Sequence, residues 1–85
     1  MSTKQNPGTY DCYAKLAIDE PYFVLRAKDP NAPALVKLWA DLRETQYGHY
    51  AKLDEARLCA AQMEDWRKAH PNAKPSIPAP HGEQP

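Results

Sequence analysis

The placement of proline limits where this chain can fold. Five of its nine prolines fall within residues 71–85, where each removes a backbone donor and disfavours a packed helix or a central strand. Residues 1–9 contain Pro7-Gly8 and almost no apolar side chains, so burial there could not offset the entropy lost on ordering. We therefore expect a flexible N-terminus over 1–9, a single small folded domain over 10–70 and a Pro-rich disordered tail over 71–85.

A helix is predicted over residues 32–46. Asn31 can cap its free amides, Pro33 fits the first turn, and Gly48 is a natural place for it to end. Apolar residues recur there at the i, i+3, i+4, i+7 spacing that lines one face of a helix. They are Leu35, Leu38, Trp39 and Leu42. We expect this face to pack into the core.

A second helix is predicted over residues 50–69, because a second apolar stripe runs along that segment and Pro71 stops it. The stripe contains Leu53, Ala56, Cys59, Ala60, Met63 and Trp66. We expect the two helices to form an antiparallel hairpin about residues 47–49. The alternative is one unbroken helix, since Leu35 and Leu53 are five full turns apart. The hairpin is favoured because glycine costs about 1 kcal/mol inside a helix.

Residues 22–28, YFVLRAK, predict a short N-terminal β segment, because they are rich in β-branched and aromatic side chains and alternate with period two. One strand cannot pair its own edges, so its partner must come from residues 10–18 or from a second protomer. Residues 10–18 fit both a strand and a helical turn, and we favour a short helix or an irregular segment there. The expected fold class is mainly α, a helical hairpin with this β segment, and unpaired strand edges favour a homodimer.

Charge is balanced along the chain. The 11 Lys and Arg residues match the 11 Asp and Glu residues, and no segment carries a basic excess. Nucleic-acid binding is therefore disfavoured, because affinity for phosphates depends on such an excess. Charged residues interrupt every apolar run well before the roughly 18 residues that cross a bilayer, and the N-terminus lacks the apolar segment of a secretory signal. We expect no membrane partner and a cytoplasmic location.

No catalytic, cofactor-binding or metal-binding constellation stands out in the sequence. Cys59 falls in the predicted core stripe and Cys12 lies between Asp11 and Tyr13, so we expect two free thiols without catalytic roles. The cysteines and histidines lack the short spacing of structural zinc sites. Adjacent carboxylates on helix faces are better explained as partners of lysine and arginine than as acid and base catalysts. We expect no cofactor and no enzymatic activity.

The second helix carries one apolar residue away from its core stripe. Leu58 lies about 160° from that stripe on a helical projection, with small or aromatic residues nearby. We predict that this face meets a partner, through Tyr50, Leu58 and Ala61. The alternative is that Leu58 is an isolated exposed leucine, which is common on protein surfaces.

Two segments of the chain resemble small uncharacterised proteins encoded by tailed bacteriophages and prophages. They are DEPYFVLRAKDPNAPALVKLWADL, residues 19–42, and EARLCAAQMEDWR, residues 55–67. The shared features are an Asp-Glu-Pro turn, a Phe-Val-Leu-Arg strand, an Ala-Pro helix start and a Met-x-x-Trp pattern, here Met63 and Trp66. The resemblance covers roughly half of the chain. It implies a phage setting and a bacterial host cytoplasm, and it transfers no activity or site residue.

These observations together favour a non-enzymatic phage-type accessory protein that binds another protein, host-encoded, in host takeover or anti-defence. Modulation or inhibition of a host enzyme or a defence complex would fit this prediction. A minor virion structural component is the alternative, and a nucleic-acid-binding protein is less favoured. A homodimer also fits, because a folded unit of about 60 residues buries only about 60% of its unfolded surface.

Overall fold

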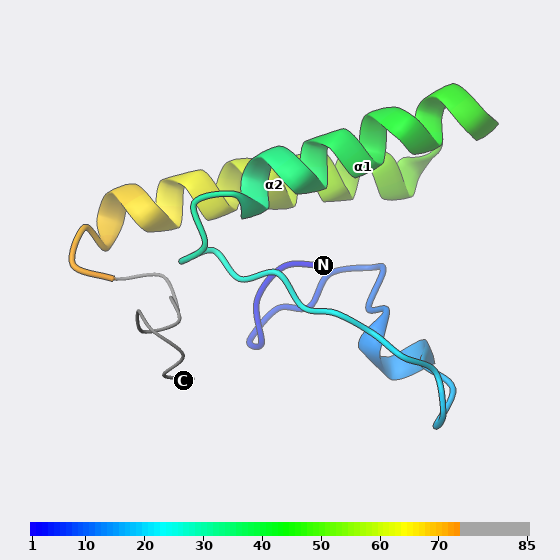
Figure 1. The fold of residues 1–85 in the computed structure, drawn as a ribbon, viewed down its shortest axis with the longest axis horizontal. Coiled ribbons are helices and arrows are strands. Elements are labelled where there is room, and N and C mark those ends of the chain that lie inside the picture. The colour runs from blue at the N-terminus through cyan, green and yellow to red at the C-terminus, as the bar shows by residue number, and fades with distance from the viewer. Residues whose placement is uncertain (74–85) are drawn as a thin grey trace, which may run out of the picture.

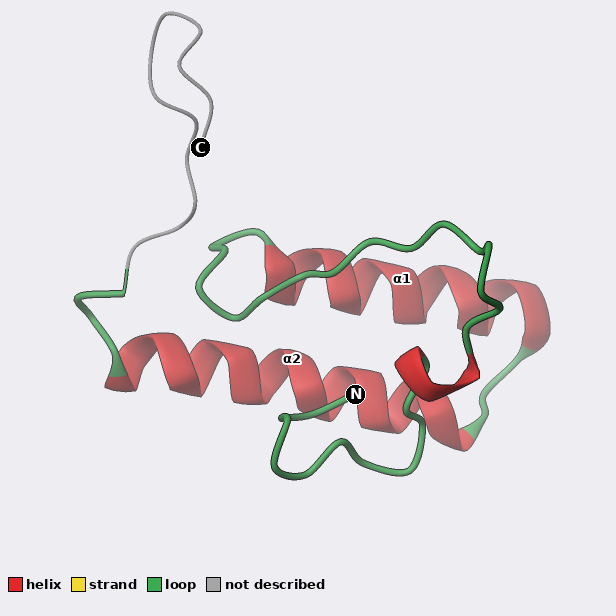
Figure 2. Ribbon diagram, turned by 90° about the horizontal axis from the view of Figure 1, so that it is seen from below, coloured by secondary structure: helices red, strands yellow, loops and turns green. Residues whose placement is uncertain are grey.

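The computed structural model describes residues 1–73 of the 85 in the chain. Two long helices, α1 (Ala32–Tyr47) and α2 (Ala51–Ala69), lie side by side and run antiparallel (Figure 1, Figure 2). One turn of 3-10 helix, η1 (Tyr13–Lys15), is the remaining element among the described residues. The mainly helical fold and the predicted hairpin are confirmed, and the alternative of one unbroken helix is wrong. Most of the predicted Pro-rich tail lies outside the described residues.

Helix α1 starts and stops close to where the sequence predicts, but Asn31 does not cap it. Asn31 is already in the αR conformation, and its side chain makes no capping hydrogen bond, so this prediction is wrong. Asp29 organises the turn instead, because its Oδ1 accepts the Asn31 N–H at 2.8 Å and its backbone oxygen accepts the Ala32 N–H at 3.1 Å. Gly48, with φ of +77°, ends the helix and donates its N–H to the Glu44 backbone oxygen at 2.7 Å.

The two helices pack through small side chains. Leu53 is the largest side chain that is fully buried, and the rest of the buried surface is mostly alanine. The buried residues of α1 are Ala32, Pro33 and Ala40, and those of α2 are Leu53, Ala56, Cys59 and Ala60. Small residues allow two helix backbones to approach closely. The predicted core stripe of the second helix is therefore confirmed over Leu53–Ala60, whereas Trp66 is 39% exposed.

The prediction that the leucine-rich face of α1 packs into the core is wrong. Its four large side chains remain partly exposed, at 46% for Leu35, 52% for Leu38, 38% for Trp39 and 53% for Leu42. A second row, Ala32, Val36 and Ala40, lies about 110° around the helix, and its members Val36 and Ala40 pack with Leu53 and Ala56 of α2 instead. Small residues on α1 fit against α2, because Ala56 and Ala60 allow the two backbones to come close together. That short distance leaves no space for a leucine or tryptophan side chain between the helices.

Ion pairs join the helices along one side of the hairpin. Arg57 bridges two carboxylates of α1, donating from NH1 to Glu44 Oε1 at 2.8 Å and from NH2 to Asp41 Oδ1 at 2.9 Å. Lys37 Nζ donates to Glu64 Oε1 at 2.7 Å nearer the other end. These pairs place the charged side of α1, with Lys37, Asp41 and Glu44, next to α2.

The predicted β segment does not form. Residues 22–28 include an extended stretch, but no strand pairs with it among the described residues. Residues 10–18 contain η1, in agreement with the favoured prediction of a short helix there. They therefore provide no strand with which residues 22–28 could pair. Without a partner, Phe23 and Val24 remain 85% and 63% exposed. Residues 1–31 as a whole lie on one side of the hairpin, below both helices in Figure 1.

Within residues 1–73, no helix is long and apolar enough to cross a membrane.

Candidate functional site

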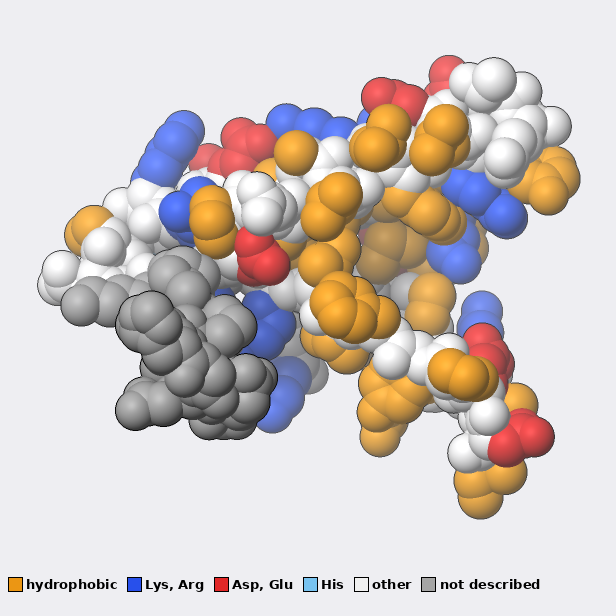
Figure 3. All heavy atoms as spheres, in the orientation of Figure 1, with side chains coloured by type: hydrophobic (Ala, Val, Ile, Leu, Met, Phe, Trp, Pro, Cys, Tyr) orange, Lys and Arg blue, Asp and Glu red, His pale blue; other side chains and the backbone are white. Residues whose placement is uncertain are grey.

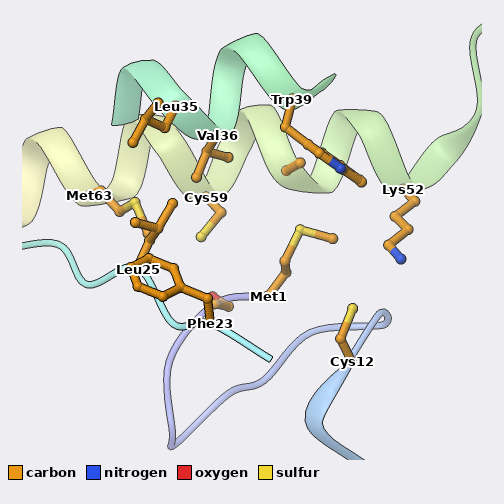
Figure 4. A pocket seen from close by; sticks show the side chains of 12 residues that line it. Met1, Cys12, Phe23, Leu25, Leu35, Val36, Trp39, Lys52, Cys59 and Met63 are labelled. Carbon is orange, nitrogen blue, oxygen red and sulfur yellow. The ribbon is translucent and has the colours of Figure 1, made fainter. Parts of the chain in front are cut away.

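An open apolar groove lies between the N-terminal segment and the two helices (Figure 4). Its volume is about 410 Å³. That is the size of pockets that hold small ligands or a few large side chains of a partner. The groove is lined by Met1, Ser2, Cys12, Phe23, Leu25, Leu35, Val36, Trp39, Lys52, Ala56, Cys59 and Met63.

Three parts of the fold bring these side chains together. Phe23 and Leu25 are two positions apart in extended chain, so both turn to the same side and reach the groove. Helix α1 contributes Val36 and Trp39 among others, one turn apart on the side next to the N-terminal segment. Helix α2 supplies the floor, which includes the buried Cys59. The alternating pattern that predicted a strand therefore places Phe23 and Leu25 on the side of the segment that faces the groove.

Glu55 of α2 holds the N-terminal segment against the hairpin. Its Oε1 accepts the Thr9 N–H at 2.8 Å, and its Oε2 accepts the Tyr10 N–H at 3.1 Å. Hydrogen bonds to a carboxylate are stronger than those between neutral groups. These two hydrogen bonds, here called the Glu55 clamp, therefore fix the position of the N-terminal segment. The part of this segment next to the clamp carries Cys12, which lines the groove.

Two cations surround the Trp39 ring. Lys52 Nζ and the Arg43 guanidinium carbon each lie 5.8 Å from the ring centroid, within the range of cation–π attraction. A hydrogen bond to the Tyr50 hydroxyl, 3.0 Å from Arg43 Nε, raises the pKa of the arginine above its usual value. Lys52 has the one charged side chain among the residues that line the groove, which also include Met1 with its charged terminal amine. The groove is thus apolar with a positive charge at one edge.

The two thiols at the groove differ in environment. Burial raises the pKa of the Cys59 thiol above its usual value, so this sulfur is protonated and a poor nucleophile at neutral pH. Cys12 is exposed. Both are free thiols within the described part of the chain. Cys59 contributes to the groove as a small apolar side chain.

The histidines of the described segment make local contacts at the ends of α2. His49 Nε2 lies 2.9 Å from Asp54 Oδ1, and His70 Nδ1 lies 2.8 Å from the Trp66 backbone oxygen while its ring stacks on the indole at 4.1 Å. Within residues 1–73 no three His, Cys, Asp or Glu side chains gather in a way that could hold a metal ion. The prediction that the chain carries no catalytic, cofactor or metal residue stays a prediction.

The three residues predicted to bind a partner differ in their surroundings. Leu58 is 59% exposed and Ala61 is exposed, both on α2. Tyr50 is half-buried, packs against the core cluster and accepts the hydrogen bond from Arg43, so it belongs to the hairpin turn. Partner binding through these residues stays a prediction.

Sequence reasoning missed the groove. Its walls come from segments as far apart as Cys12 and Met63, and no local pattern indicates that they meet. The one available signal is the alternation of Phe23 and Leu25, which predicts a side that seeks burial. Comparisons of the chain with protein-family models, with curated proteins and with solved structures found no match.

Proposed function

We propose that this chain is a non-enzymatic accessory protein that binds another, host-encoded protein through the apolar groove. The observation that carries the proposal is the exposure of Phe23, a residue that is 85% accessible at a groove lined almost entirely by apolar side chains. Burial of apolar surface contributes about 25 cal/mol of favourable free energy for each Å² removed from water. Contiguous exposed apolar surface therefore marks interaction sites.

The groove favours an amphipathic helix as the bound segment of the partner. Helices dock in apolar grooves by inserting side chains spaced three or four residues apart, and about 410 Å³ accommodates a few of them. Lys52 stands at the edge beside Trp39, so an acidic residue next to the apolar anchors of the partner would complement the groove.

The phage setting and the bacterial cytoplasm are part of this proposal and rest on the sequence resemblance. Modulation or inhibition of a host enzyme or a defence complex is the form of action that we infer. The near-absence of charge in the groove supports a protein partner over nucleic acid, because phosphate recognition depends on several cations together.

Affinity capture from bacterial lysate tests the proposal, with immobilised protein and bound proteins identified by mass spectrometry. Phe23→Asp places a charge in the groove and should abolish capture of a specific partner. Val24→Asp is the matched control, because Val24 is the neighbouring exposed residue and does not line the groove. Capture that Phe23→Asp leaves intact would contradict the groove as the binding site.

A Leu58→Glu variant in the same experiment separates the groove from the outer face of α2. Loss of capture with Leu58→Glu alone would move the binding site to the surface predicted from the sequence. Recovery of the immobilised protein alone, from every variant, would contradict host-protein binding. That result would favour the second candidate, a minor virion structural component, for which the exposed leucines of α1 are the supporting observation.

A further inference from the structure

We propose that the four sulfur-containing side chains of this chain form a binding site for one Cu(I) ion in the groove. The chain has two cysteines and two methionines, and all four line the groove: Met1, Cys12, Cys59 and Met63. The proposal departs from the sequence prediction of no metal ligand, because the spacing that disfavours zinc concerns cysteine and histidine and does not count thioethers. It is tested with the metal alone, so it can fail or hold independently of host-protein binding.

Helix α2 provides one thiol and one thioether. Cys59 and Met63 are four positions apart, so their side chains lie on the same face of the helix, one turn from each other. Cys59 is buried and Met63 is half-buried. Figure 4 shows both side chains on the groove side of α2. The spacing of these two residues therefore supplies half of a sulfur site from one rigid element.

The N-terminal segment provides the other thiol and thioether. The side chain of Met1 packs against the buried cluster between the helices, and its terminal amine donates to the Tyr10 backbone oxygen at 3.3 Å. The Glu55 clamp holds the amide of Tyr10, two residues before Cys12. In Figure 4 the Met1 side chain lies between Cys59 and Cys12. The same contacts that fix the N-terminal segment thus bring its two sulfur atoms to the groove.

The ligand atoms present favour Cu(I) over other metal ions. Thiolate and thioether are soft ligands that select Cu(I). Among the described residues that line the groove there is no histidine, aspartate or glutamate. Mg²⁺ and Ca²⁺ would lack their oxygen ligands, and Zn²⁺ would find only the two thiolates of its usual ligand set. Figure 3 shows apolar side chains from α1 down to the N-terminal segment, and such surroundings exclude competing water.

The charges at the groove suit a copper thiolate. Each thiol releases its proton to solvent as its sulfur binds the metal, and copper stays Cu(I) throughout. Two thiolates and one Cu(I) leave a single net negative charge. Lys52 and the terminal amine of Met1, both at the groove, offset that charge. Methionine has three rotatable bonds, so each thioether can turn toward the metal without moving the backbone.

Competition with the coloured Cu(I) chelator bicinchoninate, without oxygen and with the full reduced chain, tests the site. Native mass spectrometry should show one copper in each 9.6 kDa chain. Cys12→Ser, Cys59→Ala and Met63→Leu should each weaken copper binding at least about tenfold, with helical circular dichroism retained. Leu58→Met is the matched control, because it adds a thioether on α2 outside the groove and should leave the affinity unchanged. No transfer of copper from the chelator, or an unchanged affinity in Met63→Leu, would overturn the proposal.

The methyl groups of the two methionines report the thioethers directly. Cu(I) is diamagnetic, so the methyl NMR signals of Met1 and Met63 stay visible, and one equivalent of Cu(I) should shift both. The same amount of Zn²⁺ should shift neither. An unshifted methyl at Met1 or Met63, or copper found in a dimer bridged by two chains, would contradict a four-sulfur site within one chain.

Discussion

Glu55 and Thr9, 46 positions apart in sequence, are joined by a hydrogen bond of 2.8 Å from the Thr9 N–H to Glu55 Oε1. The second carboxylate oxygen accepts the next amide, that of Tyr10, at 3.1 Å. One side chain of α2 thus satisfies two backbone donors of a segment that has no helix or strand to pair them. This contact positions the part of the chain that walls the groove.

Removal of the Glu55 carboxylate should release the N-terminal segment without unfolding the hairpin. In Glu55→Ala the amides of Thr9 and Tyr10 lose their acceptor, and we expect their hydrogen exchange to accelerate at least tenfold, since one such bond contributes about 1.5 kcal/mol. Exchange measured by NMR should change little in α1 and α2. Glu55→Gln, which keeps one acceptor oxygen, should give an intermediate rate. Unchanged exchange at both amides in Glu55→Ala would show that the clamp does not operate in solution.

Gly8→Ala should disturb the same clamp from the other side. Gly8 has φ of +82°, and a Cβ there would lie 2.8 Å from Glu55 Oε1. The matched control is Gly48→Ala, at φ of +77° with no atom within 4 Å of the added Cβ. Both variants carry backbone strain of about 1–3 kcal/mol, because a residue with a Cβ is disfavoured at these positive φ values. Only Gly8→Ala should accelerate exchange at Thr9 and Tyr10, and equal acceleration by Gly48→Ala would contradict the close approach to Glu55.

The ion pair between Lys37 and Glu64 should make stability fall in acid. The hydrogen bond and charge of Lys37 hold the pKa of Glu64 below its ordinary value of 4.5. A depressed pKa means that the folded chain binds this proton less readily than the unfolded chain. The stabilisation is therefore complete above about pH 4.5 and disappears as the pH falls through the lower folded value.

Carboxyl NMR titration of Glu64 in the wild-type protein and in Lys37→Met measures this effect. The pKa of Glu64 should rise toward its ordinary value in Lys37→Met, and the difference should shrink in high salt because the pair is partly exposed. Identical titration curves for the two proteins would mean that the pair does not persist in solution.

The two thiols should react at different rates with an alkylating reagent. Cys12 is exposed, whereas Cys59 is buried with a raised pKa, so less of it is thiolate at any given pH. At pH 8 we expect Cys12 to be alkylated at least tenfold faster, as followed by intact mass and peptide mapping. Denaturant should bring the two rates together. Comparable native rates would contradict the burial of Cys59 at the floor of the groove.

Local sequence signals were sufficient to predict the helices. Gly48 permits the positive φ that ends α1, and Pro71 limits α2, so both helices fall within a residue or so of the predicted bounds. These signals act over one or two turns and need no tertiary information. The hairpin follows from these signals. Two amphipathic helices joined by a three-residue link can bury their apolar faces against each other only if the chain reverses direction at the link.

The packing of α1 could not be read from hydrophobicity. Leucine and tryptophan outrank alanine on any apolar scale, so the row with Leu38 and Leu42 was predicted as core. The side chains of α2 decided the outcome, because the small side chain of Ala56 accepts the close approach of Ala40. The groove was missed for a related reason, since its walls meet only after the helices have paired.

The arrangement on which both proposals depend is the contact of α1 with α2 through Ala40, with Leu42 left outside. Urea denaturation tests it most directly. We predict that Ala40→Leu lowers the free energy of unfolding by about 1–3 kcal/mol through overpacking. Leu42→Glu should change it by less than about 0.5 kcal/mol, as surface substitutions do. A large loss with Leu42→Glu and none with Ala40→Leu would mean that the leucine-rich face is the core and would contradict the structure.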